Sequence, residues 1–311
     1  MAGGVAVLTD EIERYIVVRR AAGHAFAAGA RLLRRYGQFA EVRGDSHVRR
    51  ETALDWAAAG ASPHARSVRM RNLVHFARFQ HAEDERHEVL PRDAFAVRWC
   101  RPLPYIYSDV EIARLLAAAD RLRLSCAYPM RRETYRTMIG LIATTGLRRS
   151  EALDLRVQDL SADGVLMIRR TKFRKSRLVP LHPTTHAALR QYIELRLRQP
   201  AADNHLFLSA GNGRIESSVA NATFRRMLAL AKIAPTRARR PRIHDLRHTF
   251  ATRALERCPG DRRAIARQFV ALSTYLGHVR MSATHWYLEA TPELMSDIAT
   301  AAETAIQGAG R

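Results

Sequence analysis

Apolar side chains recur three or four positions apart through the first hundred residues, which is the spacing of an amphipathic helix. They fall into successive groups: Ile12, Tyr15 and Ile16; Phe26, Leu33 and Tyr36; Leu54 and Trp56; and Val68, Leu73, Phe76 and Phe79. The pattern predicts an all-helical first domain over residues 1–98.

Polar residues suggest where these helices begin. Asp10, with Glu13 three residues later, is typical of a helix start, and Ser46 is a candidate cap for the third helix. Ser62 precedes Pro63, which suits the first position of a helix, so a fourth helix is expected to begin there.

A proline-containing linker is expected over residues 99–106, because the residue before a proline is disfavoured in a helix. Ser108 and Glu111 form a predicted capping box for the next helix, which should run to Ala119. Further helices are expected over residues 133–144, 184–198, 219–232 and 244–256, and an amphipathic tail helix over residues 292–307. Two short β-type runs, Val165–Ile168 and Leu178–Leu181, flank a basic turn and predict an antiparallel hairpin.

The net charge of the chain indicates which kind of molecule it binds. The chain has 311 residues, a formal net charge of +21 and a pI near 11.1, which points to nucleic acid. Residues 101–311 carry most of the excess, so the second domain is expected to be the main phosphate-binding body. Nearly all the basic residues are arginine; the three lysines are Lys172, Lys175 and Lys232.

The cysteines indicate a reducing compartment. Cys100, Cys126 and Cys258 form no C-x-x-C pair, so neither a disulfide framework nor a zinc ribbon is expected. With no apolar run of membrane-spanning length and no leader pattern, we expect a soluble cytoplasmic protein associated with the nucleoid.

Two arginines stand in motifs suited to gripping a phosphate. Arg148 follows Thr-Gly-Leu at a turn into a helix, and Arg247 lies in the stretch Arg-Ile-His-Asp-Leu-Arg-His. A planar guanidinium binds two phosphate oxygens and stays charged. Each alone is readily explained as a surface arginine, but together they favour a phosphate clamp.

Lys172 is the candidate proton donor to a leaving oxygen, because a lysine can release a proton and arginine practically cannot. It lies in the basic turn of the predicted hairpin, with Lys175 as the fallback. A basic turn that only contacts phosphate would account for the same residues.

Histidines surround the second arginine motif. His244 and Arg247 are three residues apart and should share a helical face. His244 and His248 have the spacing of a helical metal site, but no third ligand is evident, so no metal is predicted. His278 follows Leu-Gly, a turn that would let its ring approach a phosphate.

Tyr287 lies nine residues after His278. A tyrosine beside a tryptophan is usually a packing residue. As a nucleophile it would need positive neighbours that favour its oxyanion, and the arginines and histidines would supply them.

In this order, the motifs around Arg148, Lys172, His244, Arg247, His278 and Tyr287 resemble the signature of the tyrosine recombinases, the phage-integrase family. The resemblance implies a mainly α fold with a small antiparallel β-sheet. A helical, SAM-like core-binding domain that clamps DNA would occupy residues 1–98, and an α+β catalytic domain residues 107–311. It further implies a site-specific DNA recombinase that needs no cofactor.

The resemblance also implies roles for the motif residues. Tyr287 would attack the scissile phosphate and form a 3′-phosphotyrosyl link. Arg148, Arg247 and His278 would stabilise the transition state, Lys172 would protonate the leaving oxygen, and His244 would assist. Glu151 resembles the family's acidic support residue. Other candidate DNA contacts are Arg149, Arg174, Lys175, Arg177, Arg239, Arg240 and Arg242.

Two departures from the usual pattern suggest a divergent branch, such as a transposon-borne integrase. Arg247 and His278 are 31 residues apart, with the extra length expected around residues 258–263, and the hairpin has Arg-Thr-Lys where many members have Gly-Lys-Gly. A homo- or hetero-tetramer on DNA, with related recombinases as partners, is implied. The tail helix would dock on a neighbouring subunit or on its own domain. A type IB topoisomerase and a catalytically silent DNA-binding regulator are the alternatives.

Overall fold

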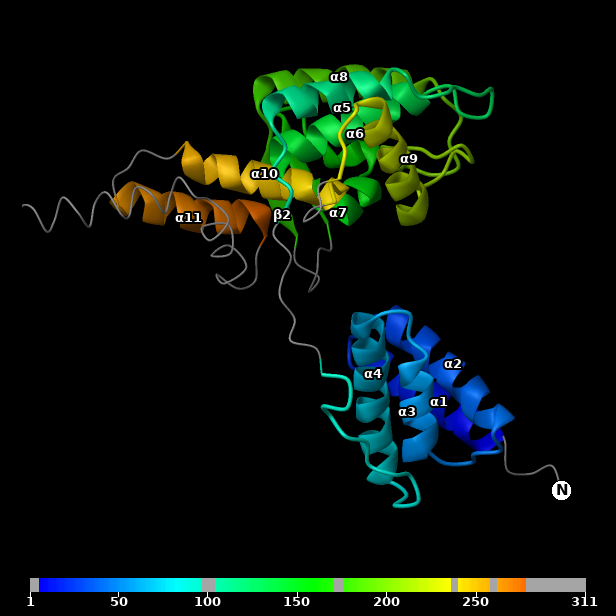
Figure 1. The fold of residues 1–311 in the computed structure, drawn as a ribbon. Coiled ribbons are helices and arrows are strands. Elements are labelled where there is room, and N and C mark those ends of the chain that lie inside the picture. The colour runs from blue at the N-terminus through cyan, green and yellow to red at the C-terminus, as the bar shows by residue number, and fades with distance from the viewer. Residues whose placement is uncertain (1–5, 97–103, 170–175, 236–239, 258–261, 278–311) are drawn as a thin grey trace, which may run out of the picture. The chain divides into compact units, whose positions relative to one another are not determined.

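The computed structural model describes residues 6–96, 104–169, 176–235, 240–257 and 262–277. The chain divides into two compact units, residues 1–101 and 102–311, and the division falls inside the expected linker. Figure 1 shows the helices of both units as a ribbon. Each unit has its own buried apolar residues. Among the described residues, no helix is both long and apolar enough to cross a membrane.

The first unit is built from four helices in the described residues, as the apolar pattern predicts: α1 (Ala6–Ala21), α2 (Ala27–Val42), α3 (Arg50–Ala58) and α4 (Pro63–His81). Their apolar faces meet in one core around Leu33, Tyr36 and Phe76, each fully buried. Ser62 caps α4 as predicted, because its Oγ accepts a hydrogen bond from the N–H of Ala65 at 3.1 Å.

Two predicted helix starts are wrong. α1 begins at Ala6 rather than Asp10, because Leu8 is buried and extends the apolar stripe by one turn. Ser46 does not cap α3: its hydroxyl pairs with His47, and α3 begins at Arg50. The N–H of Arg50 instead binds Glu88, a residue far along the chain that sequence spacing does not reveal.

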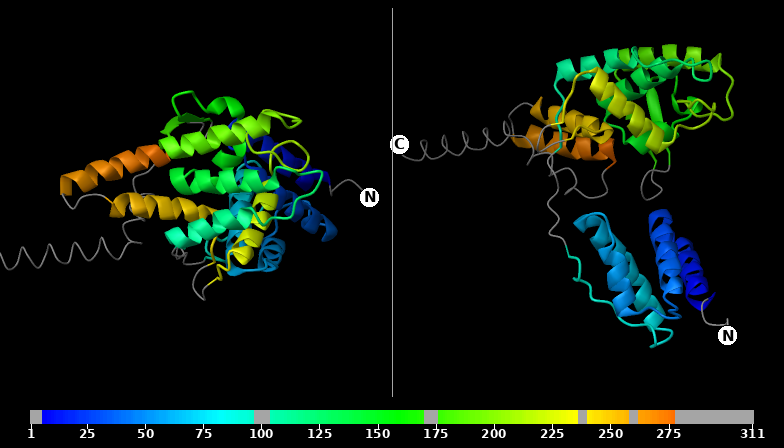
Figure 2. Two further views of the ribbon diagram at one scale, coloured as in Figure 1. Left: turned by 90° about the horizontal axis from the view of Figure 1, so that it is seen from above. Right: turned by 45° about the vertical axis from the view of Figure 1, so that its right-hand side comes forward.

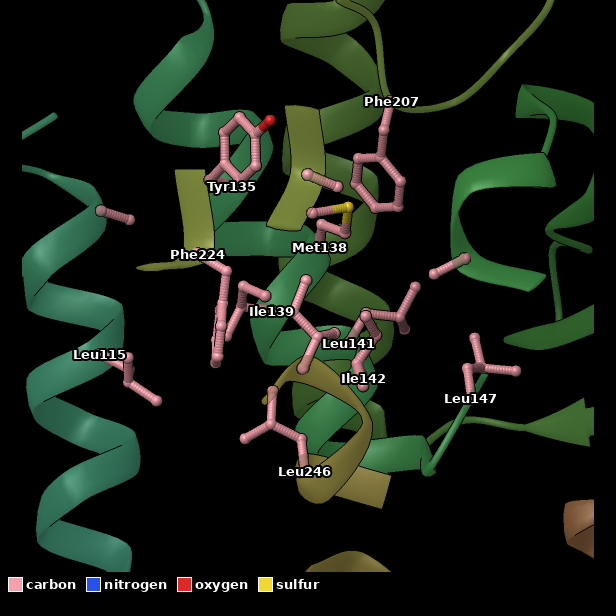
Figure 3. Close-up of a cluster of buried hydrophobic side chains, with 14 of the residues drawn as sticks. Leu115, Tyr135, Met138, Ile139, Leu141, Ile142, Leu147, Phe207, Phe224 and Leu246 are labelled. Carbon is pink, nitrogen blue, oxygen red and sulfur yellow. The ribbon is translucent and has the colours of Figure 1, made fainter. Parts of the chain in front are cut away.

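The second unit is mainly helical, with α5 (Asp109–Ala119), α6 (Arg131–Thr145), α7 (Arg149–Asp154), α8 (Pro183–Leu197), α9 (Ser217–Leu230), α10 (Ile243–Glu256) and α11 (Arg262–Leu276). The predicted capping box at the start of α5 is confirmed. Helix α6 is central: α5, α8 and α10 all pack against it. Figure 3 shows Leu115, Phe224 and Leu246, from three other helices, around its Met138 and Ile139.

The predicted hairpin is confirmed as a two-stranded antiparallel sheet of β1 (Val165–Ile168) and β2 (Arg177–Pro180). Val165 pairs with Pro180 and Ile168 with Arg177, so β2 begins one residue before the predicted run. Pro180, which lacks an N–H, ends its strand, where the loss of a donor costs least.

Helices α10 and α11 lie side by side and extend beyond the other helices of this unit (Figures 1 and 2). A small apolar cluster that includes Leu255, Phe269 and Leu272 holds them together. Helix α11 occupies most of the interval between Arg247 and the glycine before His278. The turn expected at residues 258–263 falls largely outside the described residues, as does the tail helix.

Candidate active site

Arg148 occupies the tight connection between α6 and α7. Gly146 ends α6 with a φ of +63°, a conformation that L side chains rarely adopt, and a Cβ there would lie 2.6 Å from Cδ1 of Phe250. The chain can therefore turn closely under α10 and present Arg148 at the start of α7. The Arg148 side chain is 25 % exposed, so it remains accessible.

Arg247 is buried on α10, with 1 % of its surface exposed. Its Nη1 donates to the carbonyl oxygen of Gly146 at 2.7 Å, and its Nη2 donates to that of Leu276 at 2.8 Å. A buried guanidinium is costly unless it is hydrogen-bonded, and these carbonyls offset part of that cost. Arg247 thereby ties α10 to the end of α6 and to the end of α11.

The two arginines converge on one turn of the chain. Arg148 Nη2 donates to the carbonyl oxygen of Gly277 at 3.1 Å, and Arg247 binds the preceding carbonyl, that of Leu276. His278 follows this turn directly in the sequence. Two motifs about a hundred residues apart thus meet at the end of α11, and this juxtaposition forms the candidate site.

Glu151 organises one side of this site. Its carboxylate accepts the backbone N–H of Arg148 at 2.9 Å and Arg148 Nη1 at 2.6 Å, and it also receives both Nη groups of Arg177. Burial raises the pKa of Glu151, but the hydrogen bonds and charges of Arg177 and Arg148 outweigh it and lower this pKa to about 2. The carboxylate is therefore ionised at neutral pH and holds both arginines.

His244 and His248 lie on the same side of α10. Their ring centroids are 4.6 Å apart and the rings are nearly perpendicular. His244 is exposed and His248 is buried. His244 and Arg247 both lie on α10, His244 exposed near its start and Arg247 buried, and their shared face stays a prediction.

A buried carboxylate that sequence reasoning did not identify supports the start of α10. Asp245 is fully buried; it accepts the N–H of Arg242 at 2.8 Å and that residue's Nη2 at 2.8 Å. Burial raises the pKa of Asp245, and the bonds from Arg242 offset this only in part. The Arg-x-x-Asp spacing, like the Arg-x-x-Glu spacing at Arg148, was the available signal for a capping acid.

The predicted DNA-binding arginines have varied surroundings. Arg149 donates to the side-chain oxygen of Asn221 at 2.7 Å, and Arg240 is exposed. Arg242 and Arg177 make the ion pairs given above. The other predicted site residues, Lys172, Arg174, Lys175, Arg239, His278 and Tyr287, lie outside the described residues.

One group in the described part of the chain could reach a common metal ion, His47, Asp84 and His87 of the first unit. The N–H of Val48 donates to Nδ1 of His87, so the neutral ring carries its proton on Nε2, which lies 3.4 Å from Oε2 of Glu11. Arg86 also holds both carboxylate oxygens of Asp84. These contacts disfavour metal binding, and we assign no metal there.

Comparison with known proteins matches residues 108–293 to the model of the phage integrase family. The chain is 38 % identical over 305 residues to y4rB of Sinorhizobium fredii, whose name assigns it to the integrases and recombinases; the match covers 94 % of this chain and 96 % of that protein. It is 33 % identical over 261 residues to the tyrosine recombinase XerD of Caulobacter vibrioides, covering 78 % and 76 % of the two chains.

Solved structures show the same fold. The XerH site-specific recombinase, bound to palindromic difH substrate in a post-cleavage complex, gives a TM-score of 0.63 at 18 % identity and covers 88 % of this chain and 78 % of that one. The Tn1549 transposon integrase in complex with transposon right end DNA gives a TM-score of 0.62 at 19 % identity, with 90 % and 94 % coverage.

Proposed function

Because the chain belongs to the phage integrase family and is a tyrosine-type site-specific recombinase, we propose that Tyr287 cleaves DNA while Arg148 and Arg247 hold the scissile phosphate. The observation that carries this assignment is the meeting of the two guanidinium groups at consecutive carbonyls, Leu276 and Gly277. The comparisons support recombination and give no support to a topoisomerase or a silent regulator.

The proposed reaction is a phosphoryl transfer that conserves the energy of the phosphodiester. The phenolic oxygen of Tyr287 forms a bond to phosphorus and loses its proton, and the bond from phosphorus to the 5′ oxygen breaks. The 5′ oxygen takes up a proton and leaves as a hydroxyl. Attack by a 5′-hydroxyl on the 3′-phosphotyrosyl link reverses these steps, so rejoining needs no nucleotide cofactor.

Positive charge at the phosphate favours this transfer in two ways. Arg148 and Arg247, with His278, would stabilise the charge that develops on the non-bridging oxygens. The same charges favour the phenolate of Tyr287 over the phenol. Because only 1 % of the surface of Arg247 is exposed, we expect its side chain to become more accessible when DNA binds.

Proton transfer is assigned to Lys172 and His244. Lys172 would protonate the leaving 5′ oxygen, and the exposed His244, at the start of α10, would assist or orient the phosphate. Glu151 would act through Arg148, which it holds with two hydrogen bonds. No metal is needed for any step.

The chain acts on DNA, and we propose that further basic residues contact its backbone: Arg149, Arg174, Lys175, Arg239, Arg240 and Arg242. We also propose a tetramer on DNA, formed with further copies or related recombinases, a nucleoid location, and a role in a mobile element. The fold shared with a transposon integrase and the departures in the motifs support that last role.

The decisive experiment looks for the covalent intermediate. Purified protein is incubated without metal with nicked DNA fragments from its own genomic flanks, and SDS-resistant protein–DNA adducts are resolved by electrophoresis. Wild type should form an adduct with one of these fragments, and Tyr287→Phe should form none while keeping its affinity for DNA, because it lacks only the attacking oxygen.

Two outcomes would contradict the proposal. An adduct that persists in Tyr287→Phe would remove the nucleophile from Tyr287. Specific DNA binding by wild type without an adduct, even with its related recombinases added, would contradict the cleavage reaction.

A further inference from the structure

Arg177 joins three segments that are distant in the sequence. It begins β2, and its Nη1 and Nη2 donate to the two carboxylate oxygens of Glu151 on α7, at 3.0 and 2.8 Å. Its Nε donates to the carbonyl oxygen of Tyr275 near the end of α11, at 2.8 Å. The side chain is 12 % exposed, so this bidentate pair is fixed in geometry and weakly screened by solvent.

The last residue before His278 packs against the same guanidinium. Gly277 has a φ of +67°, and a Cβ there would lie 3.1 Å from Cδ and from Nη1 of Arg177. The carbonyl of Gly277 binds Arg148, and that of Tyr275 binds Arg177. Two arginines that share one carboxylate therefore hold the turn from which the chain continues to His278.

From this arrangement, and resting on the proposed function, we infer that Arg177 is a positioning residue for strand cleavage. Through Glu151 it fixes the side chain of Arg148, and through Tyr275 it fixes the turn that leads to His278. It also anchors the start of β2, just after the basic turn that carries Lys172. One guanidinium thus links the segments that bear three of the proposed catalytic groups.

A positioning role for Arg177 can be told apart from a DNA contact, because a substitution would change a different measured quantity in each case. Each of the three nitrogen atoms of the guanidinium donates to a protein acceptor, and the side chain is only 12 % exposed, so little of the guanidinium is accessible to a phosphate. A positioning residue affects the cleavage rate when DNA is saturating. A phosphate contact affects DNA affinity and its dependence on salt.

The test measures single-turnover cleavage of the nicked fragment and, separately, its dissociation constant. Arg177→Met should lower the cleavage rate at saturating DNA about 30-fold, equivalent to about 2 kcal/mol, and change the dissociation constant less than about threefold. Arg177→Lys should recover part of the rate, because it keeps the charge but not the fork. Arg214→Met is the matched control: Arg214 also pairs with an acid of α7, Asp154, but away from the site.

A second measurement requires no DNA. Amide hydrogen exchange in the last turn of α11 should quicken about tenfold in Arg177→Met, because Tyr275 loses its bond to β2, and should not change in Arg214→Met. If Arg177→Met does not fold, as judged by thermal unfolding, Arg177→Lys takes its place in both experiments.

The outcomes separate this inference from the proposed function. An adduct formed by Tyr287→Phe would overturn the assignment of the nucleophile while leaving the exchange result to decide the role of Arg177. If Tyr287→Phe is inactive and Arg177→Met cleaves at the wild-type rate, or if exchange in α11 is unchanged, the positioning role is wrong. Weakened DNA affinity with an unchanged saturating rate would make Arg177 a DNA contact instead.

Discussion

Two buried carboxylates of the second unit occupy the same local position at a helix start, but the fold shifts their pKa values in different directions. Glu151 on α7 and Asp245 on α10 each follow an arginine by three residues and accept that arginine's backbone N–H. The pKa of Glu151 is lowered to about 2, whereas burial raises the pKa of Asp245. The same capping motif is therefore compatible with a lowered pKa at one site and a raised pKa at the other.

The difference comes from a partner outside the motif. Glu151 receives two arginines, Arg148 and the largely buried Arg177, whose combined charge outweighs the penalty of burial. Among the described residues, the one cation that pairs with Asp245 is Arg242, whose side chain is 54 % exposed and partly screened by water. Local spacing places a carboxylate at a helix start, but its charge state depends on what the fold brings to it.

The largest expected effect comes from neutralising each carboxylate. Glu151→Gln should lower the free energy of unfolding by about 3 kcal/mol, because two partly buried arginines lose the buried anion that they share. Asp245→Asn should cost less, about 1 kcal/mol, since Asn resembles the protonated form that burial already favours. Urea unfolding at pH 7 measures both. Equal losses of unfolding free energy in the two variants would show that the second arginine, Arg177, adds nothing to the stabilising effect of Glu151.

The pH dependence of stability should differ in sign between them. The folded-state pKa of Glu151, about 2, lies below its usual value of 4.5, so its contribution is present above pH 4.5 and is lost as pH falls toward 2. The pKa of Asp245 is raised above 3.8, so its contribution is present below pH 3.8 and is lost as pH rises from 3.8 through the higher folded-state pKa.

Unfolding free energies between pH 2 and 6 check this sign. Between pH 6 and pH 2, the free energy of unfolding of Glu151→Gln should fall by roughly 2–3 kcal/mol less than that of wild type. The fall in Asp245→Asn should be slightly larger than in wild type. An acid profile that Glu151→Gln leaves unchanged would contradict an ionised, arginine-bound Glu151.

The smallest expected effect tests whether a side chain at Gly277 disturbs Arg177, the partner of Glu151, beyond the cost of its backbone conformation. Gly277→Ala should lose about 1 kcal/mol from its positive φ and lose further cleavage activity, about tenfold, because the Cβ presses on Arg177. Gly23→Ala is the control, since Gly23 has a φ of +83° but nothing within 4 Å of the added carbon. We expect both variants to lose a similar free energy of unfolding, and only Gly277→Ala to cleave DNA more slowly. Equal cleavage rates in the two variants would contradict the contact between residue 277 and Arg177.

Much of the helical framework was predictable because the controlling interactions are local. Ser62 and Ser108 cap their helices through residues three positions away. The strand pair follows from two short apolar runs, Val165–Ile168 and Leu178–Leu181, on either side of the basic turn. The start of α3 was missed because its capping acid, Glu88, is 38 residues from Arg50.

For the site, the sequence by itself determined the residue types and their order: Arg148 at a glycine turn, Glu151 one turn later, and His244 and Arg247 on one helix. Tertiary structure alone decided that Arg177 reaches Glu151, 26 residues away, and Tyr275, 98 residues away. It also decided that the pKa of Glu151 is lowered and that of Asp245 is raised. Spacing along a chain fixes which neighbours share a helical turn, whereas charge state and burial depend on contacts that only the packed fold creates.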